Sequence, residues 1–567
     1  MRHKIRRGVV PSVALAGVVG AMTIAALRAG QEPAADLIVT GGPVYTAGTP
    51  GTVEALAVRG DRFVRVGRVA DVMALEGADT RVIRLPPGAI VVPGLHDAHG
   101  HFVGLGESLS QIDLRDTPNQ TAIVARIRQR VAGRGDASWV IGRGWDQNDW
   151  PDPQWPTRAA LDAVAPQTPV YLTRIDGHAA WVNSRALAAA GITSATADPP
   201  GGRLLRDASG EPTGVLIDTA QALVEQHIPP ASRSQVHDQI LLADREARRL
   251  GLTMVHDAGA GTPVIDTYRR LSDQGVLGTR LYVMLDSSPA TTREWFARGP
   301  LIDPAYKVTV RAVKLYADGA LGSRGALLLD DYADEPGTRG LRVTPLDQLA
   351  ATAEAATRAG FQPCTHAIGD AANREVLNVY EQLSRSDRRV RALRPRIEHA
   401  QILDRSDIPR FGQLGVIASM QPTHCTSDMP WAPARLGAAR VEEGAYVWRS
   451  LLQSGARLAS GSDFPVEHAN PMLGFYAAIT RQDGHGQPPA GWNPDQRLSR
   501  DEALRSFTIE AAYAAHAERD LGSIEVGKLA DFVILSRDIM TVPPAEIPAT
   551  DVRQSFVGGR QVFPVLP

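Results

Sequence analysis

Short apolar runs and longer helical stretches alternate along the middle of this 567-residue chain. Such alternation is typical of a parallel sheet, because parallel strands need a crossover connection that a helix usually supplies. Eight such runs predict a (β/α)8 barrel, in which eight parallel strands close into a cylinder surrounded by helices. The expected strands are residues 91–97, 252–257, 281–286, 311–316, 361–366, 395–399, 416–421 and 457–463.

The chain is longer than a single barrel, which takes roughly 250 residues. β-Branched runs separated by Gly and charged residues occur in 33–92 and again in 521–567. We expect these two pieces to pair into one small composite β-sandwich, with the barrel in 93–520 between them. The wide gap between the first two expected barrel strands predicts an inserted subdomain at about 103–232.

A basic stretch followed by an apolar stretch opens the chain. Residues 1–7 read MRHKIRR, and residues 8–27 carry no charge. This order is typical of an export signal, and about 20 apolar residues are also enough to span a membrane as an uncleaved anchor. We therefore expect 1–32 to be a signal peptide or an N-terminal anchor. The protein would then be periplasmic, extracellular or held at the membrane by this segment alone.

Charge and cysteine content exclude several classes of function. Lys and Arg total 60 and Asp and Glu total 62, so the formal charge is −2 and there is no basic excess for nucleic acid. Cys364 and Cys425 can make at most one disulfide and no four-cysteine metal site. GxSxG, HExxH, P-loop, GxGxxG and CxxC motifs are absent from the sequence, which argues against serine hydrolases, zincins, NTPases and Rossmann enzymes. We expect a small-molecule substrate. The sequence leaves open whether the chain forms a homo-oligomer.

The motif P-G-L-H-D-A-H-G-H at residues 93–101 carries the strongest chemical signal. Alternate side chains of an extended strand face the same way, so His99 and His101 can both bind a divalent metal where a barrel strand ends. Asp97 has the same parity and can orient a ligand or reach the metal itself. Two histidines at this spacing also occur in surface loops, so the metal hypothesis depends on further ligands.

Further ligand-type residues end later strands. His366 ends the fifth expected strand, His399 the sixth and Asp463 the eighth, and in a barrel these ends converge on one mouth. Lys314 lies in the otherwise apolar fourth strand, where a buried lysine needs a counter-charge or a depressed pKa. A neutral amine there can add carbon dioxide and form a carbamate that bridges two metals. A lysine paired with an acid is the plainer alternative.

Longer motifs surround these residues, among them GRGWDQNDWP, VKLYADGALGSRGA, THAIGDAAN, RIEHAQ, MQPTHCTSDMPW and ASGSDFPVE. From about residue 36 to its end, the chain resembles the amidohydrolase superfamily, specifically its amidohydrolase-3 branch of YtcJ-like metal-dependent hydrolases. The resemblance implies an α/β fold: a metallo-dependent (β/α)8 TIM barrel, a composite β-sandwich from both termini, and an insertion after barrel strand 1. It also implies a metal site of six residues, which are His99, His101, Lys314, His366, His399 and Asp463.

The resemblance also implies a reaction. One or two divalent ions would activate a water molecule. Zinc is the metal that best suits imidazole and carboxylate ligands. The family can carry a carboxylated lysine at the position of Lys314. Asp463 would act as general base and then as general acid in hydrolysing the C–N bond of a small amide, formamide or cyclic amide. The same site can instead cleave an ester, lactone or phosphotriester, and a non-catalytic binding protein is the third alternative.

A second group of residues resembles family positions near the barrel mouth. We expect these residues to bind substrate, although loop structure would equally explain each of them. They are Trp145, Asp146, His178, Arg324 and His424.

Overall fold

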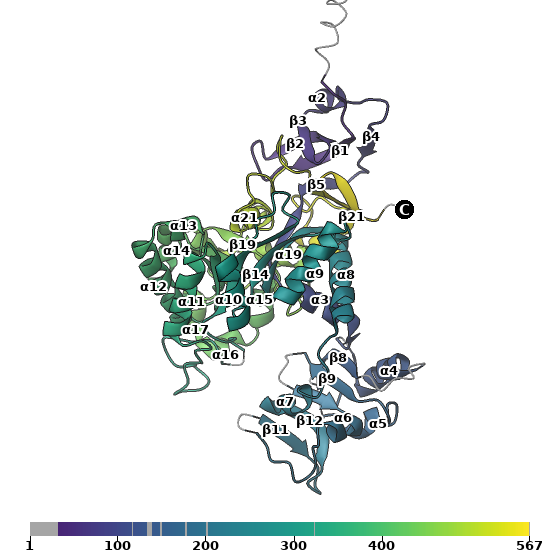
Figure 1. The fold of residues 1–567 in the computed structure, drawn as a ribbon, viewed down its shortest axis with the longest axis vertical. Coiled ribbons are helices and arrows are strands. Elements are labelled where there is room, and N and C mark those ends of the chain that lie inside the picture. The colour runs from purple at the N-terminus through teal and green to yellow at the C-terminus, as the bar shows by residue number, and fades with distance from the viewer. Residues whose placement is uncertain are drawn as a thin grey trace, which may run out of the picture.

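The computed structural model describes residues 32–565 except 116, 133–138, 148–149, 153, 176–178, 200–201 and 323. The expected leader at 1–32 lies outside the described residues apart from its last one. None of the helices within the described ranges is long and apolar enough to cross a membrane. Figure 1 shows three parts: a sheet built from both ends of the chain, a central barrel, and a separate inserted unit.

Eight parallel strands form the central sheet and follow one another around it in chain order. Hydrogen bonds just past the first and last strands close the ring: the Asp463 N–H donates to the His99 carbonyl at 2.7 Å, and the His101 N–H donates to the Phe464 carbonyl at 2.8 Å. The predicted α/β barrel is confirmed. Its strands are β6 (Leu95–Gly100), β13 (Leu252–Ala260), β14 (Arg280–Leu285), β15 (Val308–Tyr316), β16 (Gln362–Ala367), β17 (Arg396–His399), β18 (Ile417–Met420) and β19 (Leu458–Ser460).

The first barrel strand begins later than the prediction of 91–97. Ile90–Pro93 form β5, which pairs with a C-terminal strand in another sheet, and β6 starts at Leu95. Between them, a Cβ added to Gly94 would collide with the side chain of Thr253. The chain therefore passes from one sheet to the other at a residue without a side chain. This shift places His99 inside β6 and His101 one residue beyond its end.

Helices cover the outside of the barrel (Figure 1). The sequence of α8 (Arg233–Arg249) shows why they form: Ser232 caps its first turn together with Gln235, and the buried residues Ile240, Ala243 and Ala247 share one face. The other helices of this part are α3 (Phe102–Ser110), α9 (Thr262–Asp273), α10 (Pro289–Arg298), α11 (Leu346–Arg358), α12 (Asp370–Ser386), α13 (Arg389–Ala392), α14 (Ile408–Leu414), α15 (Pro422–Asp428), α16 (Ala432–Leu436), α17 (Ala438–Gly444), α18 (Trp448–Gln453), α19 (Pro471–Thr480), α20 (Arg500–Ser506) and α21 (Ile509–Ala514).

Strands from both ends of the chain form one mixed eight-stranded sheet. Its strands are β1 (Leu37–Tyr45), β2 (Thr52–Arg59), β3 (Arg62–Gly67), β4 (Arg81–Arg84), β5, β20 (Phe532–Leu535), β21 (Val552–Val557) and β22 (Arg560–Phe563), and α2 (Val69–Met73) follows β3. The order is β22-β21-β20-β5-β1-β2-β3, with β4 beside β1. Because β5 pairs with β20 and leads directly into β6, the C-terminal segment is joined to the start of the barrel.

The inserted unit has a sheet of its own, at the lower end of Figure 1. This sheet begins at Ile112, later than the expected boundary near 103, because α3 packs against α8 of the barrel layer. A Cβ added to Gly106 would collide with the backbone of Gln239 in α8. The elements of the unit are β7 (Ile112–Asp113), α4 (Gln120–Val131), β8 (Val140–Trp145), α5 (Arg158–Asp162), β9 (Val170–Arg174), β10 (Ala179–Val182), α6 (Ser184–Ala189), β11 (Gly202–Arg206), β12 (Pro212–Asp218) and α7 (Ala222–Glu225).

A buried ion pair joins the terminal sheet to the barrel. The Nε and Nη2 atoms of Arg280, at the start of β14, lie 2.6 and 2.9 Å from the two carboxylate oxygens of Asp531. Both side chains are almost fully buried, at 6% and 2% exposure. Asp531 also accepts a hydrogen bond from the Gly558 N–H at 2.7 Å. The pair therefore fixes both the barrel strand and the turn between β21 and β22.

We expect Asp531→Asn to lower the free energy of unfolding by about 3–5 kcal/mol, because the Arg280 guanidinium would stay buried without its counter-charge. Urea unfolding followed by circular dichroism measures this loss. Asp71→Asn is the control, since Asp71 forms a solvent-exposed pair with Arg68, and it should leave the midpoint unchanged. Equal midpoints for Asp531→Asn and the wild type would contradict the assigned role.

Candidate metal centre

Six polar side chains meet at the carboxyl ends of the barrel strands. All lie near the end of a strand or shortly beyond it, as expected for the mouth of a barrel. They come from β6, β15, β16 and β17 and from the segments after β6 and β19. We call them the metal-site residues: His99, His101, Lys314, His366, His399 and Asp463.

Asp463 lies closest to the histidines of the first strand. Its Oδ1 atom is 3.1 Å from His101 Nε2 and 3.5 Å from His99 Nε2. One ligand atom from each of His99, His399 and Asp463 lies within 4.8 Å of the other two. These three buried residues can therefore bind one metal ion between them.

His366 and Lys314 complete the cluster. The centroids of the His366 and His399 rings are 4.5 Å apart, and Lys314 Nζ lies 3.1 Å from His99 Nε2. Lys314 Nζ is also 4.9 Å from the centroid of the Tyr316 ring. Burial of the Lys314 side chain lowers the pKa of its amine. The neutral amine is therefore more populated here than on the protein surface.

The donor atoms of this cluster fit a divalent metal. Asp463 Oδ1 and His366 Nε2 are buried and make no hydrogen bond with the described residues. Burial, reinforced by the charge of Lys314, lowers the pKa of His99 to about 4 and that of His366 to about 3. Both rings are therefore neutral near pH 7, the form that binds metals. Imidazole nitrogens with one carboxylate suit zinc and other first-row divalent ions.

Two metal-site residues have a left-handed backbone. The φ angle is 76° at His399 and 59° at Asp463. Residues other than glycine rarely adopt this conformation, which persists only where the surrounding structure enforces it and is frequent at functional sites. His399 is the last residue of β17, and Asp463 lies shortly after the end of β19. The backbone of the cluster is thus held in place by the fold around it.

Hydrogen bonds behind the cluster orient two of its histidines. His99 Nδ1 lies 2.5 Å from Glu398 Oε2, and His399 Nδ1 lies 2.8 Å from Gln421 Oε1. These oxygens can only accept, so Nδ1 carries the proton in each ring and Nε2 stays free to bind a metal. Neither Glu398 nor Gln421 stands out in the sequence. Glu398 directly precedes a ligand-type residue in the motif RIEH, which is the one local signal that could have found it.

Asp97 supports the cluster through hydrogen bonds. It accepts hydrogen bonds from the Ser462 hydroxyl at 2.6 Å and from the His99 N–H at 3.0 Å. Burial raises the pKa of Asp97 to about 7. Asp97 therefore fastens the segment that carries Asp463 to the strand that carries His99. The sequence left open whether Asp97 orients a ligand or reaches the metal itself, and these hydrogen bonds match the first role.

Among the expected substrate-binding residues that the structure describes, His424 lies beside the cluster. Its Nε2 atom is 3.7 Å from Asp463 Oδ2, and its ring is stacked with that of His399 at a centroid distance of 5.9 Å. Its Nδ1 atom lies 3.0 Å from the Gln401 amide nitrogen. An amide nitrogen can only donate, so Nδ1 accepts and Nε2 carries the ring proton.

The three other expected substrate-binding residues that the structure describes have their partners away from the cluster. Trp145 is fully buried in the core of the inserted sheet, because its ring packs among the other tryptophans there. Asp146 forms an ion pair with Arg174 at 2.6 Å, also within the inserted unit. Arg324 lies on a loop, where acidic neighbours of the same loop pair with it. His178 lies outside the described residues.

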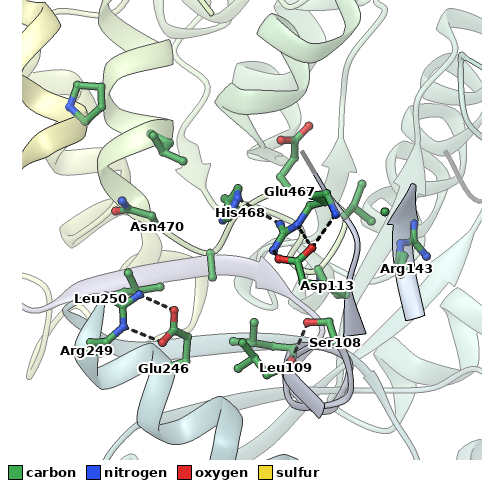
Figure 2. Close-up of a pocket in the computed structure, with 18 of the residues that line it drawn as sticks. Ser108, Leu109, Asp113, Arg143, Glu246, Arg249, Leu250, Glu467, His468 and Asn470 are labelled. Atoms are coloured by element: carbon green, nitrogen blue, oxygen red, sulfur yellow. Dashed lines mark hydrogen bonds and ion pairs between the residues drawn. The ribbon is translucent and has the colours of Figure 1, made fainter. Parts of the chain in front are cut away.

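A separate cavity of about 430 Å³ lies between the barrel and the inserted unit (Figure 2). Ser108 from α3, Asp113 and Arg143 from the inserted sheet, and His468 from the segment after β19 are part of its wall. Arg115 Nη1 lies 3.1 Å from His468 Nε2 and so links the two units. None of the metal-site residues, all of which the structure describes, lines this cavity. It is therefore distinct from the metal centre.

The sequence has extensive matches among known proteins. The model of the amidohydrolase family matches residues 87–563. The protein LONG AFTER FAR-RED 3 of Arabidopsis thaliana is 36% identical over 94% of this chain and 92% of its own. The putative amidohydrolase YtcJ of Bacillus subtilis is 34% identical over 84% of this chain and 89% of its own. The N-substituted formamide deformylase of Arthrobacter pascens is 28% identical over 92% of this chain and 97% of its own.

The fold has a close match among solved structures. An uncharacterized metal-dependent hydrolase from Pyrococcus horikoshii superposes with a TM-score of 0.74 and 27% identity, over 90% of this chain and 99% of that one. The family model spans the barrel and strands of the terminal sheet on both sides of it. On these grounds the chain belongs to the amidohydrolase family.

Proposed function

We propose that the protein hydrolyses the C–N bond of a small non-peptide amide, formamide or cyclic amide in a metal-dependent reaction. The observation that carries this proposal is the cluster of histidines around Asp463, in which buried atoms of the ligand type are left without hydrogen bonds. The similarity to an N-substituted formamide deformylase supports an amide or formamide within the larger class of hydrolysable bonds.

One ion would be held by His99, His399 and Asp463. The ligand set for one or two ions would be completed by His101, His366 and Lys314. Zinc is the metal we propose, since these ligand types suit it. When bound, the metal supplies a nucleophilic water at neutral pH and polarises the substrate carbonyl.

Asp463 is the residue that we assign to proton transfer. Burial by itself would raise its pKa, but the neighbouring imidazoles of His101, His99 and His399 hold the pKa well below its usual value. The carboxylate is therefore ionised at neutral pH and can accept a proton from the attacking water. The same oxygen can then pass that proton to the leaving nitrogen, so that Asp463 ends the cycle ionised again.

His424 is the residue that we assign to the substrate carbonyl. Its Nε2–H is buried, faces the Asp463 carboxylate from 3.7 Å, and makes no hydrogen bond with the described residues. A donor held in this way can stabilise the negative charge that develops on the carbonyl oxygen. Gln401 keeps the proton on Nε2 by donating to Nδ1.

A carboxylated Lys314 is part of the proposal. The neutral amine that burial favours is the form that attacks carbon dioxide, and one proton is released as the new C–N bond forms. The product is a carbamate, whose two oxygens are suitable ligands for divalent ions.

The reaction class is tested with a panel of N-formyl amides, N-acyl amides, cyclic amides, esters, lactones and phosphotriesters. We expect hydrolysis of at least one amide-type substrate, its loss after chelation, and its recovery when zinc or manganese is added back. Chelated protein returned to buffer without metal is the control. Hydrolysis confined to the oxygen esters, or amide hydrolysis that survives complete metal removal, would contradict the proposal.

Asp463→Asn should lower kcat by about 10²–10⁴-fold, because the amide cannot take up the water proton. Steady-state kinetics with the amide substrate found in the panel measure this change, and circular dichroism checks the fold. Asp71→Asn, at an exposed ion pair outside the site, should keep wild-type kinetics. Full activity of Asp463→Asn would rule out the assigned proton transfer.

His424→Leu should lower kcat by about 10²–10³-fold, because it removes a donor to the developing oxyanion. The metal content should stay at the wild-type level, since His424 is not among the proposed ligands. Kinetics combined with metal analysis by plasma mass spectrometry separate the two roles. Loss of bound metal in His424→Leu would show that His424 is a ligand instead.

A further inference from the structure

A buried ion pair lies inside the barrel beneath the metal-site residues. Arg396 and Glu398 are two residues apart in β17, so their side chains share one face of the strand. Arg396 Nε is 2.8 Å from Glu398 Oε1, and both side chains have 0% exposure. The pair thus lies fully out of contact with solvent, directly before His399 in the chain.

Glu398 reaches from this pair to the first barrel strand. Its Oε2 atom is 2.5 Å from His99 Nδ1. A carboxylate oxygen accepts, so it holds the ring proton of His99 on Nδ1. The opposite nitrogen, Nε2, lies 3.1 Å from Lys314 Nζ and 3.5 Å from Asp463 Oδ1. Glu398 therefore selects which nitrogen of His99 is available inside the cluster.

Arg396 ties Glu398 to the surrounding strands. Its Nη2 atom donates to Glu398 Oε2 at 3.0 Å, to the Ala98 carbonyl at 2.6 Å and to the Ser419 hydroxyl at 2.8 Å. Its Nη1 atom donates to His256 Nδ1 at 3.0 Å. These contacts reach β6, β13 and β18. Since Ala98 directly precedes His99, Arg396 holds both the carboxylate and the backbone that position this ring.

The energetics of burial suggest that stability is not the main role of this pair. Taking two charges out of water costs several kcal/mol per ion, and apolar residues of similar volume are often as stabilising as a buried ion pair. A pair kept for packing alone would not need a 2.5 Å hydrogen bond to a ligand-type histidine. Orientation and basicity of that histidine are what a buried carboxylate can supply and an apolar side chain cannot.

We propose that Glu398 and Arg396 are positioning residues that set the metal affinity of His99. Glu398 acts on the ring through Nδ1, and Arg396 acts through Glu398 and the Ala98 carbonyl. The inference rests on the proposed function, because it requires the metal centre to exist. Partners of this kind typically contribute about 10–100-fold to metal affinity.

Two variants test the proposal without reference to any substrate. Glu398→Gln keeps an oxygen that can accept from Nδ1 but removes the charge. The double variant Arg396→Met/Glu398→Met removes the pair and leaves no uncompensated ion. Zinc affinity is measured by competition with a chromogenic chelator, the cobalt(II) absorption spectrum reports ligand geometry, and urea unfolding of the metal-free proteins reports stability.

We expect zinc affinity to fall by about 10-fold in Glu398→Gln and by about 100-fold in the double variant, with an altered cobalt spectrum in both. The metal-free double variant should unfold at a urea concentration close to that of the wild type. Asp244→Asn is the matched control. Asp244 is a buried carboxylate on α8 that pairs with Arg248 at 2.8 Å, so this variant should lose stability but bind zinc like the wild type.

Wild-type zinc affinity in both Glu398 variants would overturn the positioning role. An equal loss of affinity in Asp244→Asn would also overturn it, because the effect would then follow from stability alone. Absence of stoichiometric zinc, cobalt or manganese binding by the wild type would instead overturn the metal centre of the proposed function, and this inference with it. That measurement precedes any variant, so the two failures are distinguishable.

Discussion

Main-chain hydrogen bonds between the first and last barrel strands determine where the metal-site residues can lie. The N–H of Asp463 donates to the carbonyl of His99, and the N–H of His101 donates to the carbonyl of Phe464. Asp97 adds a side-chain contact to Ser462. The backbones that close the cylinder belong to the residues whose side chains form the cluster. Closing the barrel therefore brings Asp463 beside His99 and His101, which links the fold to the chemistry of the site.

Burial then gives the cluster its chemical character. Inside the closed barrel, the imidazoles of His99 and His366 are neutral because a charged ring would lose its hydration, and the amine of Lys314 is shifted toward its neutral form for the same reason. Burying so many polar groups is costly unless hydrogen bonds or a metal compensate them. Glu398 and Gln421 compensate the outer nitrogens of His99 and His399. On the inner side, His366 Nε2 and Asp463 Oδ1 make no hydrogen bond with the described residues, an arrangement that suits a metal ion.

Much of the barrel and its cluster could be predicted because most barrel strands are short apolar runs and ligand-type residues lie at or near the ends of several of them. The boundary at 91–97 was wrong because only Gly94 stands between Ile90–Pro93 and Leu95–Gly100 in the sequence, and nothing local shows that the chain changes sheets there, beside Thr253. Trp145 and Arg324 show a second limit. The residue types suggested that both side chains contact substrate. In the structure, the core of the inserted sheet buries the indole of Trp145, and Asp334 pairs with the guanidinium of Arg324. Neither set of neighbours stands out in the sequence.

The sequence by itself determined the alternation of strands and helices, the strand ends that carry ligand-type residues, and the resemblance to the amidohydrolases. These are local properties, since hydrophobic periodicity and side-chain parity depend only on neighbouring residues. The tertiary structure alone decided that Glu398 faces His99, that Gln401 faces His424, and that the terminal strands pair beside the barrel. Those contacts join segments far apart in the chain, and their geometry follows from barrel closure, which no local pattern encodes.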